Sequence, residues 1–242
     1  MKILVLSDIH ANLTALQAVL DQADNVDRVW CLGDIVGYGP DPNQCVEAVR
    51  QLPEVVCLRG NHDSAVCGLV SKSNFNYKAQ EVLYWTEAEL KEANRKFLAS
   101  LPAKRELERV TIAHGSPRRP TWEYIMDTAT AEENFDHFET EYCLVGHSHL
   151  PVMYLQREGR QAVEVSHLAA GEQRELIPKT IVNPGSVGQP RDRDPRAAYA
   201  VYHEETNTWT QHRVDYDIAA VQARMQQAEL PGDYIRRLEM GW

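Results

Sequence analysis

The chain has 242 residues, of which 43% are hydrophobic and 25% are charged, a composition typical of globular proteins. Its 35 Asp and Glu outnumber 25 Lys and Arg, so the formal net charge is −10, which argues against a nucleic-acid-binding surface or a basic membrane-surface segment. No apolar stretch reaches the length of a membrane span, and the five cysteines include no CxxC pair, so we expect buried free thiols and a soluble cytoplasmic protein.

The first third of the chain alternates the patterns of strands and helices. Continuous apolar runs, as in strands buried on both faces, predict strands at residues 2–7, 28–32 and 55–58. Apolar residues at helical spacing predict helices at 13–20 and 42–52, with Asn12 and Asp41 as their N-caps. This βαβαβ order indicates a parallel sheet.

The next segment reads as a helical insertion. Residues 64–101 carry no strand pattern, and residues 77–98 are rich in Ala, Glu, Leu and Lys at roughly helical spacing. We expect an insertion at about residues 64–105 that forms a cap beside the functional site.

Beyond the insertion the predicted elements are short. Strands are expected at 109–113 and 142–145, with a helix at 131–138 between them, and then at 152–156, 161–166, 180–182, 197–202 and 208–214. Residues 158–159 and 205–207 look like hairpin connections, and a helix at 218–228 precedes a polar tail. No repeat or low-complexity linker divides the chain, so we expect one domain over residues 1–242.

Polar residues of metal-binding type recur where the predicted strands end. They are Asp8 and His10 after the first strand, Asp34 after the second, Asn61 and His62 after the third, His114 after the fourth, and His147 and His149 after the fifth. In an open α/β sheet, ligands bind outside the carboxyl ends of the strands. We therefore expect these side chains, spread over more than 140 positions, to converge on one edge of the sheet.

The composition of this set predicts a centre with two divalent cations. Several imidazoles, two carboxylates and one amide exceed the ligands of a single tetrahedral zinc, and Asp34 is the natural bridge because its two oxygens can bind both ions. Nitrogen and oxygen donors without a thiolate favour Mn²⁺ first, with Fe, Zn²⁺, Co²⁺ or Ni²⁺ possible, over Ca²⁺ or Mg²⁺. Two such ions about 3.5–4 Å apart suit phosphoryl transfer.

Each motif alone has a plainer explanation. A single Asp-x-His or Gly-Asp is usually structural or exposed, and His147-Ser148-His149 could be a surface turn. The joint occurrence decides between the two interpretations, because five of the nine histidines fall in these motifs, each after an apolar run.

The ordered motifs resemble those of the calcineurin-like metallophosphoesterase superfamily. They are Asp8-x-His10, Gly33-Asp34, Gly60-Asn61-His62-Asp63, His114 and Gly146-His147-x-His149. The segment Asn183-Pro184-Gly185-Ser186, which leads on to Arg191, is similar to one in the small bacterial and archaeal phosphodiesterase branch of that superfamily.

The resemblance implies an α/β fold, a four-layer α/β/β/α sandwich with two facing mixed sheets. It implies one cation held by Asp8, His10, Asp34 and His149, and another held by Asp34, Asn61, His114 and His147. A metal-bound hydroxide would attack phosphorus, and His62 would stabilise the transition state and protonate the leaving oxygen.

The chain departs from the superfamily at two places. Gly37 and Tyr38 stand where the protein serine/threonine phosphatases carry Asp and Arg, so an Asp partner for His62 is missing at that point, which argues against a eukaryotic-type protein phosphatase. Ala11 follows His10 where many relatives have Gly, which matters only if the backbone there needs a positive φ.

Substrate contacts are predicted from residues that follow the ligands. Arg118 and Tyr124 come soon after His114, where an Arg could clamp a phosphate and an aromatic ring could stack on a base, or where both could belong to an ordinary surface loop. With Asn61, they are the candidate substrate-binding residues. Arg191 and Arg193 are expected in an exposed charged turn, and residues 183–186 in a tight turn near the metal edge.

The sequence therefore predicts a hydrolase that cleaves phosphodiesters or phosphomonoesters of a small phosphorylated substrate. The alternatives are a dinucleoside polyphosphate hydrolase, a protein phosphatase and, from another class, a non-catalytic interaction scaffold such as the retromer subunit, which resembles these enzymes but lacks the catalytic His. The presence of His62 and of all seven metal ligands argues against the scaffold.

Overall fold

Two six-stranded sheets form the centre of the computed structural model, which describes residues 1–157, 159 and 162–242. The first contains β1 (Lys2–Leu6), β2 (Arg28–Cys31), β3 (Val56–Cys57), β9 (Gln173–Glu175), β11 (Ala197–His203) and β12 (Thr208–Val214), in the order β3-β2-β1-β11-β12-β9. The second contains β4 (Lys104–Glu106), β5 (Val110–Ala113), β6 (Tyr142–Leu144), β7 (Pro151–Leu155), β8 (Glu164–His167) and β10 (Thr180–Pro184), in the order β4-β5-β6-β10-β7-β8.

Both sheets are mixed, as expected. The pairs β1–β2 and β2–β3 are parallel, which confirms the predicted βαβαβ unit, whereas β11 joins β1 antiparallel. In the second sheet β6 is parallel to β5 and β10, and β7 is antiparallel to β10. Residues 158 and 161, which belong to the expected turn at 158–159 and the expected strand at 161–166, lie outside the described residues.

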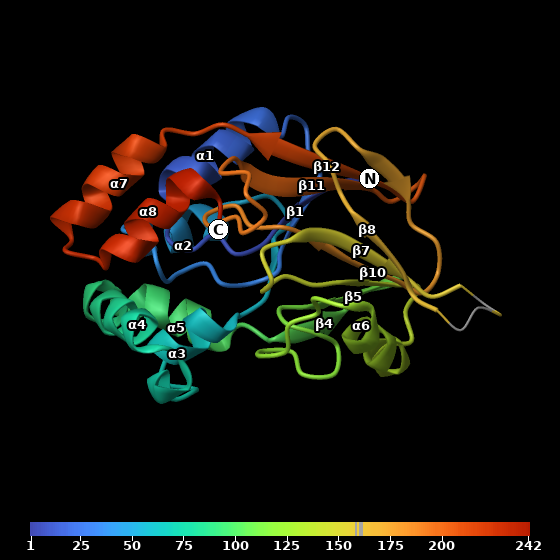
Figure 1. The fold of residues 1–242 in the computed structure, drawn as a ribbon, viewed down its shortest axis with the longest axis horizontal. Helices are drawn as coiled ribbons and strands as arrows, with labels where there is room; N and C mark the ends of the chain where they lie inside the picture. The colour runs from blue at the N-terminus through green and yellow to red at the C-terminus, as the bar shows by residue number, and fades with distance from the viewer. Residues whose placement is uncertain (158, 160–161) are drawn as a thin grey trace.

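The sheets face each other across a shared apolar layer (Figure 1). Ile3 and Val5 of β1 are fully buried in one cluster with Ile112 of β5 and Leu144 of β6. Burying each such side chain contributes about 1.5–3 kcal/mol before the entropy cost is counted, so this layer holds the two sheets together. It also brings the strand ends of both sheets to a common edge.

Helices cover the outer faces and complete the predicted four layers. Helices α1 (Leu13–Gln22) and α2 (Pro42–Arg50) pack on the first sheet, and α6 (Thr128–Asn134) packs on the second (Figure 1). The Asn12 side chain accepts the N–H of Ala15 at 3.0 Å, which confirms that cap. Asp41 is the N-cap residue of α2 with Pro42 after it, as predicted, but its side chain makes no capping hydrogen bond and instead pairs with Arg224 at 2.9 Å.

A separate helical layer lies beside one end of the sheets. It contains α3 (Asn61–Val66), α4 (Tyr77–Glu89), α5 (Glu92–Ser100), α7 (Ile218–Gln227) and α8 (Gly232–Met240), and a short 3₁₀ turn, η1 (Lys72–Asn74). Val82 of α4, Met225 of α7 and Leu238 of α8 are buried in one cluster with Tyr38, so segments far apart in the sequence meet there (Figure 1).

Three expectations for these segments are corrected. The predicted polar tail contains α8, because Tyr234, Ile235 and Leu238 share one buried face. The helical segment ends at Ser100, since Lys104–Glu106 pairs antiparallel with β5. The helix expected at 131–138 begins at Thr128 and ends in the 3₁₀ turn η2 (Phe135–His137). Within the described part of the chain, no helix is both long and apolar enough to cross a membrane.

Candidate metal centre and active site

The seven predicted metal ligands converge at the edge shared by the two sheets. Each follows the carboxyl end of a strand and is at most 3% exposed: Asp8 and His10 after β1, Asp34 after β2, Asn61 after β3, His114 after β5, and His147 and His149 after β6. The sequence expectation that they gather at one edge is confirmed, and they come from both sheets.

Two groups of these side chains could each hold a metal ion. The ligand atoms of Asp8, His10 and His149 all lie within 4.8 Å of one another, and so do those of Asp34, His114 and His147. Asn61 joins the second group, because its Oδ1 lies 3.2 Å from His114 Nε2.

Asp34 lies between the two groups. Its Oδ2 is 3.7 Å from His10 Nε2 and 3.5 Å from His114 Nε2. Its Oδ1 accepts the backbone N–H of His62 at 2.9 Å. A single oxygen, Oδ2, therefore faces both groups.

Backbone carbonyls orient the histidines toward the centre. Nδ1 of His10 lies 3.2 Å from Val36 O, Nδ1 of His114 lies 2.9 Å from Leu32 O, and Nδ1 of His149 lies 2.5 Å from Gln189 O. A carbonyl can only accept, so each Nδ1 carries the proton and each Nε2 presents a lone pair.

Several buried atoms that could ligate a metal have no favourable hydrogen bond in the described part of the chain. His10 Nε2 and His149 Nε2 are 3.0 Å apart although neither carries a proton. Asp8 Oδ1 and His147 Nε2 have no hydrogen-bond partner among the described residues. Because unpaired buried groups are costly, and these are imidazole and carboxylate donors, the set fits divalent cations.

The electrostatics agree with that fit. Burial lowers the pKa of His10 and of His147, and neighbouring histidines add to the effect, so both rings are neutral and able to ligate. Burial raises the pKa of Asp34, and the negative charges of Asp63 and Asp8 raise it further. A carboxylate in such surroundings stays ionised only when positive charge lies beside it.

Backbone strain is concentrated in the same loops. Five of the seven candidate ligands have a positive φ: Asp8 (54°), His10 (48°), Asp34 (52°), His147 (66°) and His149 (61°). Ala11 also has a φ of 50°, so a glycine would be less strained there, by about 1 kcal/mol. Strain of this kind persists where the surrounding structure holds functional groups in place.

His62 borders the centre, and one of its ring nitrogens lies within 4.8 Å of ligand atoms of His10 and Asp34, so the three form a third group that could hold a metal ion. Its ring lies 4.9 Å from that of His10 and 4.4 Å from that of Tyr38, and its Nδ1 is buried without a partner among the described residues. A Cβ at Gly37 would collide with this ring, so the glycine makes room for it. The neighbouring Asp63 accepts the N–H groups of Gly60 and Val36 and fixes the loops around His62.

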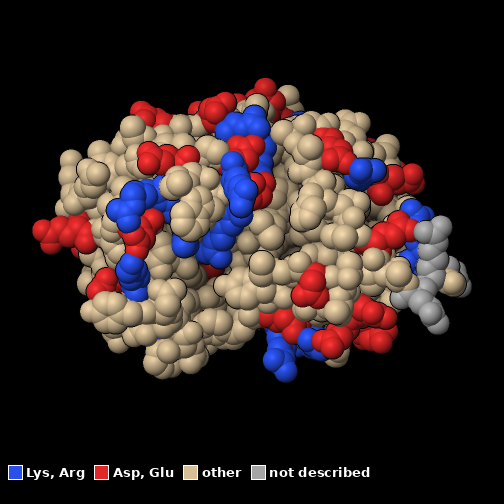
Figure 2. All heavy atoms as spheres, in the orientation of Figure 1, with Lys and Arg blue, Asp and Glu red and all other residues tan. Residues whose placement is uncertain are grey.

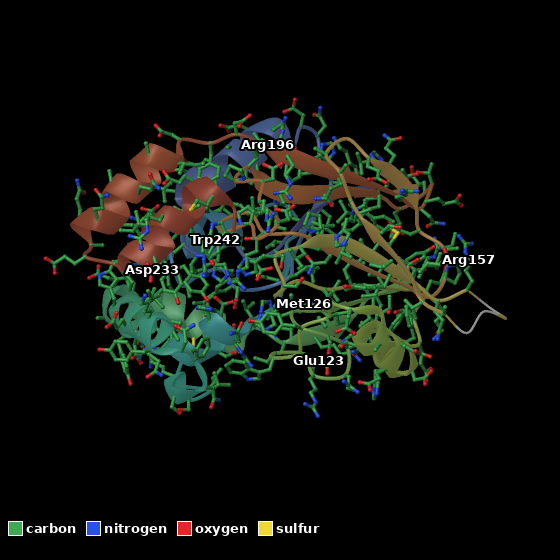
Figure 3. All side chains as sticks on the ribbon, viewed as in Figure 1. Glu123, Met126, Arg157, Arg196, Asp233 and Trp242 are labelled. Atoms are coloured by element: carbon green, nitrogen blue, oxygen red, sulfur yellow. The ribbon has the colours of Figure 1, made fainter. Side chains whose placement is uncertain are left out.

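The loop after His114 brings one of its two candidate contacts to the centre. The Tyr124 ring stacks on His147 with centroids 3.8 Å apart, and Tyr124 is 43% exposed, so it covers the ligand from outside. Arg118 pairs instead with Glu123 and with Glu133, the latter at 2.7 Å, so acidic neighbours neutralise its charge. Figure 3 shows Glu123 on this loop, below the sheets.

Arg191 is the functional candidate that the sequence argument missed. Its expected exposed position is wrong: its Nε is buried without a partner, and its guanidinium lies 5.9 Å from the centroid of Tyr38. In the described part of the chain it forms no ion pair; it donates to Gln189 Oε1 at 3.2 Å and also hydrogen-bonds with Tyr124. Its charge acts on Tyr38, Tyr124 and Asp8, so it faces the centre.

The available signal for Arg191 was its place after the Asn-Pro-Gly-Ser turn. Ser186 Oγ donates to Asp8 O at 2.7 Å, and Gly188 N donates to the same oxygen at 3.0 Å. Asn183 and Pro184 end β10, so the predicted tight turn does not include them, but the segment lies at the metal edge as predicted and Arg191 follows in the loop after it. Arg193 is exposed, as expected.

Two facing mixed sheets with a buried His, Asp and Asn centre at their common edge are the architecture of a metal-dependent phosphoesterase. Residues 1–207 match the domain of the calcineurin-like phosphoesterase superfamily, and the chain belongs to that family, whose members hydrolyse phosphate ester bonds and depend on metal ions.

Similar proteins agree with this assignment over nearly the full length. A metallophosphoesterase structure from Sphaerobacter thermophilus is 46% identical, with a TM-score of 0.93, and covers 100% of this chain and 99% of its own. An uncharacterised protein of Methanocaldococcus jannaschii is 37% identical over 99% of this chain and 98% of its own length. Phosphodiesterase YfcE of Escherichia coli is 26% identical over 83% of this chain and 86% of its own length.

Proposed function

We propose that this chain hydrolyses phosphodiesters or phosphomonoesters with two divalent cations. One is held by Asp8, His10, Asp34 and His149, and the other by Asp34, Asn61, His114 and His147. The observation that carries the proposal is the single Asp34 oxygen that faces both groups. Nitrogen and oxygen donors without a thiolate make Mn²⁺ the first candidate, ahead of Fe, Zn²⁺, Co²⁺ and Ni²⁺.

The cations, when bound, supply the positive charge that offsets the phosphate oxygens and lower the pKa of a water molecule. The protein supplies the remaining functions. His62 has a ring nitrogen without a partner in the described structure, and it donates a proton to the leaving oxygen. The Arg191 guanidinium holds the phosphate oxygens through charge-assisted hydrogen bonds.

Two further side chains position the substrate. Asn61 Oδ1 faces His114, which leaves the amide N–H groups free to donate to a phosphate oxygen. Tyr124, stacked on His147 and partly exposed, contacts the organic group of the substrate. Arg118 has no part in this proposal, because Glu123 and Glu133 occupy its guanidinium.

The test is hydrolysis of a chromogenic bis-aryl phosphate by protein freed of metal and then supplied with Mn²⁺. We expect chelated protein to be inactive and Mn²⁺ to restore turnover. Full activity in chelator would contradict the proposal. A panel of monoesters, diesters, dinucleoside polyphosphates and phosphopeptides then ranks the substrate classes.

His62→Ala separates chemistry from metal binding in the same assay. We expect turnover to fall by about 10²–10⁴ with metal content unchanged, since this residue moves a proton and holds no ion. The exposed His203 provides the control, and His203→Ala should leave turnover as it was. A His62 variant that loses its metal would show that its role is ligation.

A further inference from the structure

The C-terminal helix α8 places a second arginine beside the centre. The Arg237 guanidinium lies 5.2 Å from the centroid of the Tyr234 ring, and Tyr234 lies 4.7 Å from Tyr38. The Tyr38 ring also lies 4.7 Å from the His10 ring. The Arg191 guanidinium lies 5.9 Å from the centroid of Tyr38. Two aromatic rings thus join Arg237 to Arg191 and to the metal edge.

Backbone contacts fix α8 against the loop that carries Arg191. The N–H of Arg193 donates to Gly241 O at 2.6 Å, and the N–H of Gly241 donates to Arg237 O at 3.0 Å. Gly241 has a φ of 65°, and a Cβ there would lie 2.7 Å from the carbonyl carbon of Asp194. The close approach of helix and loop therefore requires the glycine, and it holds Arg237 one turn away from the Arg191 loop.

Neither arginine has an acidic partner in the parts of the chain that are described. Arg236, on the same helix as Arg237, does have such a partner, because it pairs with Asp233. Arg237 is half-buried, and burial together with the positive charge of Arg191 lowers its pKa. Partly buried positive charges that form no ion pair are unfavourable, and a bound anion offsets that cost.

Lys and Arg atoms also gather on this side of the molecule. Figure 2 shows them, interspersed with Asp and Glu atoms, in a band between the C-terminal helices and the strands, on a chain whose net charge is −10. In Figure 3, Asp233 and Trp242 mark the two ends of α8 beside this band. Positive side chains are thus present on the surface beside α8, although the chain as a whole is acidic.

We propose that Arg237 binds a second phosphate group, adjacent to the phosphate that Arg191 holds at the metal centre, so that the two arginines together form an anion subsite. The inference rests on the proposed function and names its substrate class: organic molecules with two or more linked phosphates, such as nucleoside diphosphates and polyphosphates. Helix α8 lies beyond residues 1–207, the part that matches the family domain, so Arg237 is outside that match whereas Arg191 is within it.

The reaction on such a substrate balances with water alone. The water oxygen bonds to the phosphorus at the metal centre, and the bond from that phosphorus to the bridging oxygen breaks. The leaving phosphate keeps the electron pair and takes one proton, and Arg237 offsets its charge.

Binding of two adenosine ligands that differ only in phosphate number tests the proposal. Isothermal titration calorimetry on His62→Ala protein, in which turnover of the monoester AMP is suppressed, with excess free Mn²⁺ held constant, compares AMP with α,β-methylene-ADP, which cannot be hydrolysed between its phosphates. We expect this protein to bind the diphosphate analogue about tenfold more tightly than AMP, and the added Arg237→Ala change to remove that preference without weakening AMP. Arg237→Lys should keep part of it, because it retains the charge.

Arg236→Ala is the matched control, since it removes an arginine from the same helix and should leave both affinities unchanged. The proposal is overturned if Arg237→Ala weakens AMP and the analogue equally, or if it changes neither, provided that the variant melts at the wild-type temperature. Because calorimetry needs no turnover, a failed subsite is distinguishable from a failed hydrolase, which the bis-aryl phosphate assay detects.

Discussion

At the scale of single residues, Asp34 connects the two halves of the centre. One oxygen is held by the N–H of His62, and the other is shared by His10 and His114. The close approach of Gly60 fixes this orientation, because a Cβ there would collide with the carboxylate. A change at Asp34 should therefore affect both ions together.

We expect Asp34→Asn to lose both cations, because the amide carries no negative charge to hold them. Metal content per chain, measured after dialysis against Mn²⁺, should fall from two equivalents toward none, and turnover should fall with it. Asp21→Asn, at an exposed position on α1, is the control. Loss of only one equivalent would contradict the bridging role.

The two arginines on which the sequence and the structure disagree show what local patterns omit. Arg118 stands close to a ligand in the sequence, but Glu123 and Glu133 neutralise it. Arg191 stands in a run of alternating charges that is typical of an exposed turn, yet Tyr38 and Tyr124 surround it. Pairing partners brought in by the fold decide whether an arginine is free, and local sequence does not contain them.

At the scale of elements, the loop between β5 and α6 depends on one carboxylate. Glu123 accepts hydrogen bonds from Ser116 Oγ at 2.7 Å and Asn134 Nδ2 at 2.8 Å, and it pairs with Arg118. Burial raises the pKa of Glu123, but these partners outweigh burial and lower the pKa to about 2. The next residue is Tyr124, so this carboxylate positions the ring that covers His147.

The lowered pKa of Glu123 makes the loop's contribution to stability depend on pH. The folded-state pKa lies below the unfolded-state value, so the stabilisation is complete above about pH 4.5 and declines as the pH falls toward 2. We expect Glu123→Gln to cost about 2 kcal/mol of unfolding free energy at pH 7, after allowance for solvent screening, and about half as much at pH 3.

Urea unfolding of the wild type and the Glu123 variant at several pH values measures this difference. Glu133→Gln, which alters an exposed partner of the same Arg118, should show little effect at any of these pH values. A cost for Glu123→Gln that stays constant from pH 7 to pH 3 would show that the ionised carboxylate is not what stabilises the loop.

Helix α8 is the element whose importance was least visible in the sequence. Its buried residues Tyr234, Ile235 and Leu238 have helical spacing, but the helix is short and begins just after Pro231. Its burial comes from α4 and α7, which lie far away in the chain. A polar stretch near a chain end gives no sign of such contacts, whereas the long apolar runs of β1 and β2 do.

At the scale of the whole molecule, the pattern of the chain predicted that the ligands meet at one sheet edge. It did not predict the second sheet or the short strands at the outer edges. Carboxyl ends of parallel strands meet at one edge, so the positions after β1, β2 and β3 were expected to converge. The packing of a second sheet against the first, with its own ligands after β5 and β6, followed from the family resemblance. The short strands β4 and β9, two edge strands with exposed side chains, carried no apolar pattern.

The central claim is that one shared carboxylate holds two cations between the sheets. Anomalous diffraction from crystals grown with Mn²⁺ tests it most directly. We predict two peaks about 3.5–4 Å apart, one beside Asp8, His10 and His149 and one beside Asn61, His114 and His147, with Asp34 between them. A single peak, or peaks away from these side chains, would contradict the account.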